Sequence, residues 1–201
     1  MIPSTLLSLP DAELHYYPAF FTLSEADDLF TQLIAPLQIA WRQESIRLFG
    51  KSVPTPRLSA WYGEEGTAYT YSGLTMQPMP FTPILLSIKQ KIEAHSSPVH
   101  FNSVLLNLYR TGSDSMGWHS DDEPELGRNP VIASVNLGAT RRFLLRHTKQ
   151  KHLKHEILLQ HGSLLLMQGT TQHFWQHAIP KTAKPTSARI NLTFRKVYPI
   201  G

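Results

Sequence analysis

The sequence contains no cysteine. This absence excludes disulfide bonds, a thiol nucleophile, an iron–sulfur cluster and any zinc site with cysteine ligands, so a metal site must rest on histidines and carboxylates. The chain also lacks an apolar run of about 18 residues and a basic N-terminal segment followed by an apolar core, so a membrane span and a secretion signal are not expected. We expect a cytoplasmic location, or a nuclear one if the source is eukaryotic.

Charge is modest, because 19 basic and 15 acidic residues give a net charge of +4 among 201 residues. A positive chain favours a polyanionic partner, although a solvated basic surface gives the same balance. The hydrophobic content of 41% is typical of a globular protein. We expect one domain over residues 1–201, no membrane partner and a monomer.

Two helices are predicted in the first half of the chain. Ser24, with Asp27 three residues later, predicts the start of an amphipathic helix. Its apolar stripe consists of Ala26, Leu29, Phe30, Leu33, Ile34 and Leu37. Thr82 and Pro83 suit the cap and first turn of a second helix that runs to about His95. Between them, residues 41–82 predict short strands and ligand-accessible loops, because glycine and proline interrupt the segment repeatedly.

The second half of the chain predicts a series of short strands separated by glycine, proline and asparagine turns. These strands cover residues 101–109, 131–137, 142–147, 155–159, 163–167, 173–178 and 187–195. The basic stretch 141–154 is expected to form a hairpin or a surface excursion. This pattern indicates an α+β, mainly β, fold: a jelly roll fronted by two helices.

Three residues predict a metal site. His119 and Asp121 are two residues apart, so on an extended segment both side chains leave the same face. His177 lies on a late predicted strand and supplies a third ligand. Two histidines and one carboxylate form the facial triad that leaves positions open on Fe(II). The pair alone is a weak signal, because the chain has ten histidines.

The last predicted strand strengthens this interpretation, because polar Arg189, Asn191, Thr193 and Arg195 alternate with apolar residues. Two arginines on one strand face are costly to bury without anions. A dicarboxylate such as 2-oxoglutarate supplies two carboxylates for them. The alternative is a solvent-facing strand whose arginines pair with local acids.

A further strand carries Asn107 and Tyr109 on one face, where both side chains can donate hydrogen bonds to the same cosubstrate. The order of these motifs is Asn107-Leu108-Tyr109, His119-Ser120-Asp121, His177 and the run from Arg189 to Arg195. This order resembles the AlkB family of Fe(II)/2-oxoglutarate dioxygenases over roughly residues 40–197. The interval from His177 to Arg189 (189 − 177 = 12 residues) is also similar to that of the family.

The resemblance implies a double-stranded β-helix (jelly roll) with two supporting N-terminal helices. Residues 99–198 would form the catalytic core, and residues 1–98 an N-terminal extension with nucleotide-recognition segments. Fe(II) would be bound by the catalytic residues His119, Asp121 and His177. The residues implied to bind the cosubstrate 2-oxoglutarate are Asn107, Tyr109, Arg189, Asn191, Thr193 and Arg195. The third reactant would be O₂.

Two segments resemble the branch of the family that repairs double-stranded DNA. Phe49-Gly50-Lys51 is similar to its finger, in which an aromatic residue intercalates where the damaged nucleotide has left the stack. Tyr69-Thr70-Tyr71-Ser72-Gly73 is similar to its aromatic segment beside the flipped base, with Tyr71 stacking opposite His119. Flipping is required physically, because a stacked base does not reach a buried iron.

The resemblance also gives roles to single residues. Glu123 corresponds to the acid that accepts from the exocyclic amine of a damaged adenine or cytosine. Arg57 corresponds to an arginine positioned near the lesion. The candidate phosphate contacts are Lys51, Arg141, Arg142 and Arg146.

The implied activity is oxidative demethylation of N-alkylated bases of the 1-methyladenine and 3-methylcytosine type in DNA. Formaldehyde is released, and 2-oxoglutarate is decarboxylated to succinate. Three alternatives stay open: the same chemistry on RNA or a protein side chain, a catalytically silent nucleic-acid-binding module, and a redox-inert zinc protein with the same three ligands.

Overall fold

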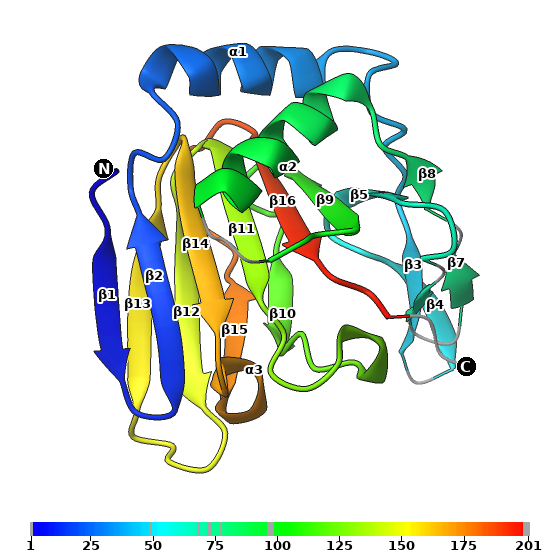
Figure 1. The fold of residues 1–201 in the computed structure, drawn as a ribbon. Coiled ribbons are helices and arrows are strands. Elements are labelled where there is room, and N and C mark those ends of the chain that lie inside the picture. Colours follow the sequence, from blue (N-terminus) through cyan, green and yellow to red (C-terminus); the bar gives the residue numbers. More distant parts are fainter. Residues whose placement is uncertain are drawn as a thin grey trace.

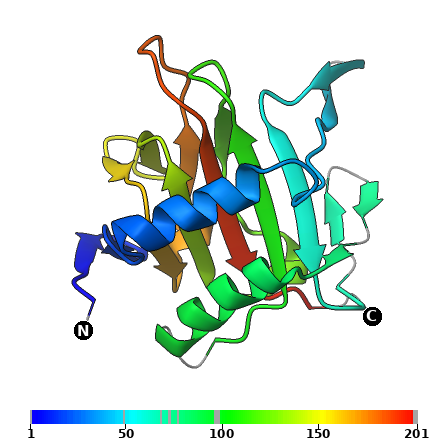
Figure 2. The ribbon, with the colours of Figure 1, turned by 90° about the horizontal axis from the view of Figure 1, so that it is seen from above.

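The computed structural model describes residues 2–48, 50–67, 69–71, 74–76, 78–95 and 99–198, without the side chains of residues 48, 69–71 and 74–76. Two β-sheets face one another, and helices α1 (Leu23–Ile34) and α2 (Pro83–His95) cover the outer face of the larger sheet (Figures 1 and 2). The predicted jelly roll with two supporting helices is therefore observed.

The larger sheet has eight strands in the order β1-β2-β14-β11-β16-β9-β5-β8. Their bounds are β1 Thr5–Leu9, β2 Ala12–Tyr17, β5 Leu58–Gly63, β8 Met79–Pro80, β9 Ser103–Tyr109, β11 Ile132–Gly138, β14 Ser163–Gln168 and β16 Arg189–Arg195. All neighbours are antiparallel except β5 and β8. The first 98 residues thus supply four strands to the same sheet as the catalytic core.

The smaller sheet has the order β10-β15-β12-β13. Its strands are β10 Met116–His119, β12 Arg141–His147, β13 Lys154–Leu159 and β15 Trp175–Ile179. The basic stretch 141–154 therefore belongs to the predicted hairpin, β12–β13. Two short helices, η1 (Pro124–Leu126) and α3 (Thr171–Phe174), flank this sheet and lead out of β10 and into β15.

The alternation of polar and apolar residues along β16 separates two apolar clusters. Ile190, Leu192 and Phe194 face the helices and pack with the buried faces of α1 and α2. A second cluster fills the space between the two sheets and includes Phe143, Trp175 and Ile179. The polar residues of β16 consequently point into the gap between the sheets, which is where a buried site has to form.

Helix α1 begins earlier and ends earlier than the sequence predicted. Thr22 is the N-cap and forms a capping box with Glu25, so the cap predicted at Ser24 and Asp27 is wrong. The helix ends at Ile34, and Leu37 is 101% exposed at φ +68°, so Leu37 lies outside the apolar stripe. Helix α2 matches its predicted bounds, and the hairpin β1–β2 was not predicted.

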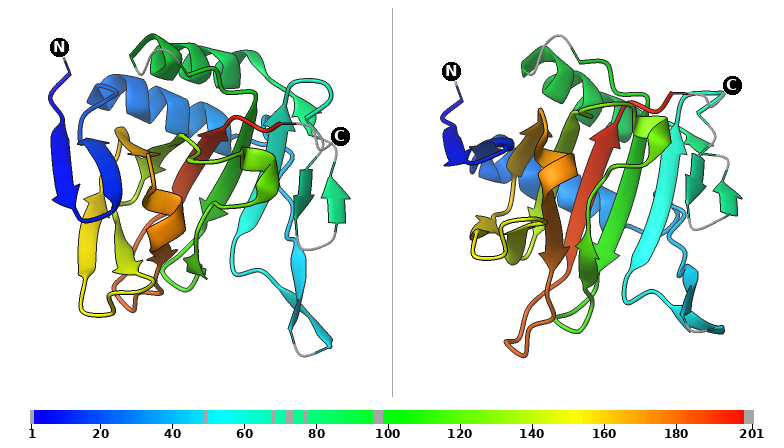
Figure 3. Two further views of the ribbon diagram at one scale, coloured as in Figure 1. Left: turned by 60° about the horizontal axis from the view of Figure 1, so that its bottom comes forward. Right: turned by 90° about the horizontal axis from the view of Figure 1, so that it is seen from below.

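Two hairpins lie near β5 and β8, at that edge of the larger sheet (Figure 1): β3 (Ser45–Leu48) with β4 (Lys51–Pro54), and β6 (Tyr69–Tyr71) with β7 (Leu74–Met76). The β3–β4 hairpin projects away from the sheets (Figure 3). Within the part of the chain that the structure describes, no helix has the length and apolar character needed to cross a membrane.

Candidate metal centre and cosubstrate cavity

The two histidines of the predicted metal site are direct partners across two neighbouring strands. His119 ends β10 and lies opposite His177 of β15, with a register shift between Met116 and His119. Their ring centroids are 4.2 Å apart. The ring of Phe143 stacks on that of His177, with the ring centroids 5.0 Å apart. Residues 58 positions apart in the sequence thus meet through strand pairing.

Asp121 completes the group, since ligand atoms of all three residues lie within 4.8 Å of one another. Its carboxylate Oδ2 is 4.0 Å from His177 Nε2. The backbone N–H of Asp121 donates to Gln172 Oε1 at 2.9 Å, which fixes the chain after β10 against α3. A set of two imidazoles and one carboxylate fits Fe(II), and the structure brings the three predicted ligands together.

Electrostatics keep both buried ligands in their metal-binding forms. Burial, together with the neighbouring His119, lowers the pKa of His177 to about 3, so the ring is neutral at pH 7. Burial alone would raise the pKa of Asp121, but Arg195 and the two histidines hold it below its ordinary value. His119 Nδ1 lies 2.9 Å from Gly117 O, so this nitrogen donates and leaves Nε2 to the metal.

Arg189 is the residue that indicates most clearly a ligand-binding position between the two sheets. Its side chain is only 1% exposed, and one nitrogen, Nη2, donates to Asn136 Oδ1. Nε and Nη1 are buried without a hydrogen-bond partner among the described residues. The ring of Tyr109 lies 4.9 Å from the guanidinium carbon. A buried cation with unused donors fits the carboxylate of 2-oxoglutarate.

Asn191 and Thr193 have a supporting position. Asn191 Nδ2 donates to Ser134 Oγ at 2.8 Å, and Thr193 Oγ1 donates to Asn191 Oδ1 at 3.1 Å. Their polar groups therefore bond to the sheet itself, on the same face as Arg189. Asn191 thereby ties β16 to β11, and the cosubstrate contacts that the resemblance implies for Asn191 and Thr193 stay predictions.

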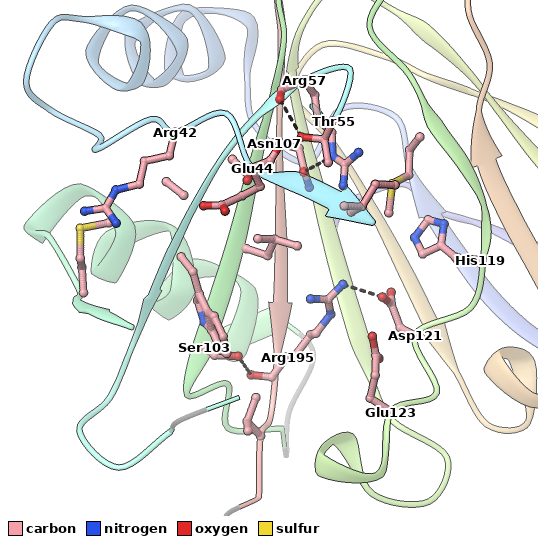
Figure 4. Close-up of a pocket in the computed structure, with 18 of the residues that line it drawn as sticks. Arg42, Glu44, Thr55, Arg57, Ser103, Asn107, His119, Asp121, Glu123 and Arg195 are labelled. Carbon is pink, nitrogen blue, oxygen red and sulfur yellow. Dashed lines mark hydrogen bonds and ion pairs between the residues drawn. The ribbon is translucent and has the colours of Figure 1, made fainter. Parts of the chain in front are cut away.

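The cavity in front of the triad is shown in Figure 4. His119, Asp121 and Glu123 line its right side in this view, and Arg57 and Asn107 line its top. The remaining lining residues that Figure 4 labels are Arg42, Glu44, Thr55, Ser103 and Arg195. The carboxylate oxygen Glu123 Oε2 is buried and has no hydrogen-bond partner among the described residues. The cavity thus contains an acceptor near the metal ligands.

The recognition segments are described in part. Leu48 of β3 pairs with Lys51 of β4, Gly50 has φ +78°, and Lys51 is exposed. Phe49 itself lies outside the described residues. For Tyr69 and Tyr71 the structure describes the backbone of β6 and not the side chains. The predicted finger and stacking roles therefore stay predictions.

The basic residues of β12 differ in whether their side chains are available for a phosphate contact. Arg141 is buried and donates to the carbonyl oxygens of Thr111, Asp114 and Pro180, so its predicted phosphate contact is wrong. Arg142 pairs with Glu156 on the exposed face. Arg146 binds Gln176 Oε1 and lies over the ring of Trp118 at 4.3 Å.

Two residues of the site were missed from the sequence. Gln172 holds the backbone of Asp121, and no local pattern marks it. Asn136 accepts from Arg189 and was detectable, because Ser134 and Asn136 alternate with Val135 and Leu137 in the same way that polar and apolar residues alternate along β16.

The comparisons with known proteins agree with this geometry. The family model of the 2OG-Fe(II) oxygenase superfamily matches residues 13–195. Alpha-ketoglutarate-dependent dioxygenase alkB homolog 3 of Bos taurus is 47% identical over 193 residues, which cover 90% of this chain and 65% of that protein. DNA oxidative demethylase ALKBH2 of Bos taurus is 38% identical over 192 residues, which cover 91% of this chain and 68% of that protein. The chain thus spans about two thirds of the length of these relatives.

A solved structure also resembles the chain. The structure of OsALKBH1 matches 94% of this chain and 99% of its own length, with a TM-score of 0.67 and 18% sequence identity. At this identity the match bears on the fold alone, and it agrees with the jelly roll described above.

Proposed function

The chain belongs to the 2OG-Fe(II) oxygenase superfamily and, within it, to the AlkB family, and from this premise we propose that it oxidatively demethylates alkylated bases in DNA. Bases of the 1-methyladenine and 3-methylcytosine type are the proposed substrates. When bound, Fe(II) with 2-oxoglutarate supplies the oxidation of the N-methyl group by O₂. The methyl carbon leaves as formaldehyde, and the cosubstrate leaves as succinate and CO₂.

The observation that carries this proposal is the position of Glu123. Its unpartnered Oε2 lines the same cavity as His119 and Asp121. A buried carboxylate oxygen without a donor is costly, and the exocyclic amine of adenine or cytosine supplies such a donor. The unpartnered oxygen in this cavity therefore favours a nucleobase over an apolar substrate beside the metal ligands.

The remaining roles follow from the position of each side chain. Arg189 binds the remote carboxylate of 2-oxoglutarate with its unused donors, and Arg195 holds Asp121 through the bond from Nη2 to Oδ1. Phe143 packs on His177 and excludes water from one side of the metal site. None of these residues transfers a proton in the proposed reaction, since they bind, orient and exclude solvent.

Duplex DNA is the proposed form of the substrate. The β3–β4 hairpin projects away from the sheets (Figure 3), and the intercalating finger that the resemblance implies, Phe49-Gly50-Lys51, belongs to this part of the sequence. One relative named above is called a DNA oxidative demethylase and is 38% identical, whereas the name of the 47% identical alkB homolog 3 specifies no nucleic acid. A comparison of duplex DNA, single-stranded DNA and RNA is therefore part of the test.

Formaldehyde release tests the proposal most directly. We expect the purified chain with Fe(II), 2-oxoglutarate and O₂ to release formaldehyde from oligonucleotides that contain 1-methyladenine or 3-methylcytosine, and His119→Ala to release none. Activity with zinc in place of iron would contradict the redox mechanism. Release from methylated RNA alone, or turnover with none of these oligonucleotides, would overturn DNA as the substrate.

A further inference from the structure

Arg57 makes its best-defined contact with another residue of the site. Its Nε donates to Asn107 Oδ1 at 2.8 Å. Both side chains are nearly buried, at 8% exposed for Arg57 and 6% for Asn107. Arg57 lies directly before β5, and β5 pairs with the β9 strand that carries Asn107. This contact therefore joins two neighbouring strands at the wall of the cavity.

The contact fixes the orientation of an amide group. Arginine has donors and no acceptor, so the Asn107 atom facing Arg57 Nε must be the carbonyl oxygen. The Asn107 NH₂ group is then directed to the other side of the amide. Among the described residues, none accepts a hydrogen bond from this NH₂ group, although Asn107 lines the cavity. Asn107 thus offers donors to whatever the cavity binds.

The position of Arg57 is itself determined by a turn. The Arg57 backbone N–H donates to Thr55 O at 2.8 Å, and Thr55 Oγ1 lies 3.3 Å from Arg57 O. Thr55 is buried and also binds the carbonyl oxygen of Glu44 through its N–H and its hydroxyl group. These bonds fix the Arg57 backbone, from which the side chain reaches Asn107, before any ligand arrives, as a preorganised site requires.

We propose that Arg57 is a positioning residue for 2-oxoglutarate: it holds the Asn107 amide with the NH₂ group toward the cosubstrate. The inference rests on the proposed function, in which Asn107 donates to 2-oxoglutarate. Without Arg57, the amide is free to turn its carbonyl oxygen toward an anion, which is repulsive. This role differs from the lesion contact that the resemblance implied, because it operates before nucleic acid binds.

The test measures 2-oxoglutarate binding by calorimetry in the full chain, with Mn(II) in place of Fe(II) and no nucleic acid. We expect Arg57→Ala to raise the dissociation constant about 10-fold, the equivalent of one hydrogen bond to a charged group. Arg57→Lys retains the positive charge and an N–H donor group and should recover part of the affinity. Mn(II) affinity and the melting temperature should match those of the unmodified chain.

Arg42→Ala is the matched control, because Arg42 lines the same cavity and carries the same charge. It should change the dissociation constant less than about 2-fold, which separates amide orientation from general attraction of an anion. In an Asn107→Ala background, Arg57→Ala should have no further effect, because the two residues act through one contact.

Three results would overturn the inference: an unchanged dissociation constant in Arg57→Ala, an equal loss in Arg42→Ala, or a full additional loss in the Asn107→Ala background. A change confined to the KM for the methylated oligonucleotide would return Arg57 to a lesion contact. Each of these results concerns the role of Arg57 alone and leaves the proposed function intact. Conversely, normal 2-oxoglutarate binding with no formaldehyde release would defeat the proposed function and leave the role of Arg57 supported.

Discussion

The gap between the two sheets and the hairpins near the β5–β8 edge are built in opposite ways. In the gap, His177, Asp121 and Arg189 are buried on strands that pair on both sides or on segments tied to them. At the edge, the strand pairing among the described residues joins β3 to β4 and β6 to β7, and joins neither hairpin to the large sheet. Burial and pairing with both neighbouring strands fix the first region, whereas the strands of the second region pair within their own hairpins.

This difference separates chemistry from recognition. A metal site requires ligands placed within a few tenths of an ångström, which a paired and packed framework provides. A surface that binds a large and variable polymer has to extend away from the protein, as a projecting hairpin does. Substitutions in the gap should therefore affect catalysis with every substrate, and substitutions in the hairpins should change the preference among substrates.

The largest effect is expected from Asp121→Ala. This change removes the one carboxylate of the triad and leaves the Arg195 guanidinium without the partner that its Nη2 binds. We expect formaldehyde release to fall more than about 100-fold for all oligonucleotides, which exceeds the usual cost of losing a residue that only supports a ligand. Metal content measured after dialysis should fall in parallel. Equal metal content in the variant would show that Asp121 is not a ligand.

Arg189→Met should separate stability from binding. The buried guanidinium has two nitrogens without partners, so a methionine of similar length removes a costly charge. We expect the melting temperature of the metal-free chain to stay the same or to rise. The KM for 2-oxoglutarate should rise roughly 10–100-fold, because charge-assisted hydrogen bonds are lost. A clear fall in the melting temperature of the metal-free variant would contradict this account.

The same comparison explains how much was predictable from the sequence. The alternation from Arg189 to Arg195 specifies which side chains enter the gap, because side chains alternate along any strand. The contact between Arg57 and Asn107 was not predictable, because it depends on the register of β5 against β9 across 50 positions. The start of α1 was misjudged because Thr22 and Ser24 both suit a cap, and only the backbone geometry distinguishes them.

Phe49→Ala should have an intermediate effect that is limited to one substrate form. If Phe49 fills the gap left by a flipped base, its loss penalises duplex DNA, in which the stack must be broken. We expect about a 10-fold fall in activity on methylated duplexes and less than about a 2-fold change on single strands. Lys51→Ala is the matched control in the same hairpin and should weaken both forms in a salt-dependent manner. Equal losses on duplex and single strands in Phe49→Ala would refute the finger.

The smallest effect is expected from Glu25→Gln, on the helix layer remote from both regions. Lys91 and the backbone of Thr22 lower the pKa of Glu25 from 4.5 to about 2, through an ion pair of 2.8 Å and the capping box. Because the folded-state pKa is depressed, the stabilisation is present above pH 4.5 and is lost as the pH falls toward 2. The Glu25 side chain is 48% exposed, so solvent screening limits its contribution to about 0.5 kcal/mol. In urea titrations, the free energies of unfolding of the unmodified chain and of Glu25→Gln should therefore differ at pH 7 and converge near pH 2. Activity at pH 7 should be unchanged. A difference that persists at low pH would assign the effect to the cap hydrogen bonds, which glutamine alters without a change in charge.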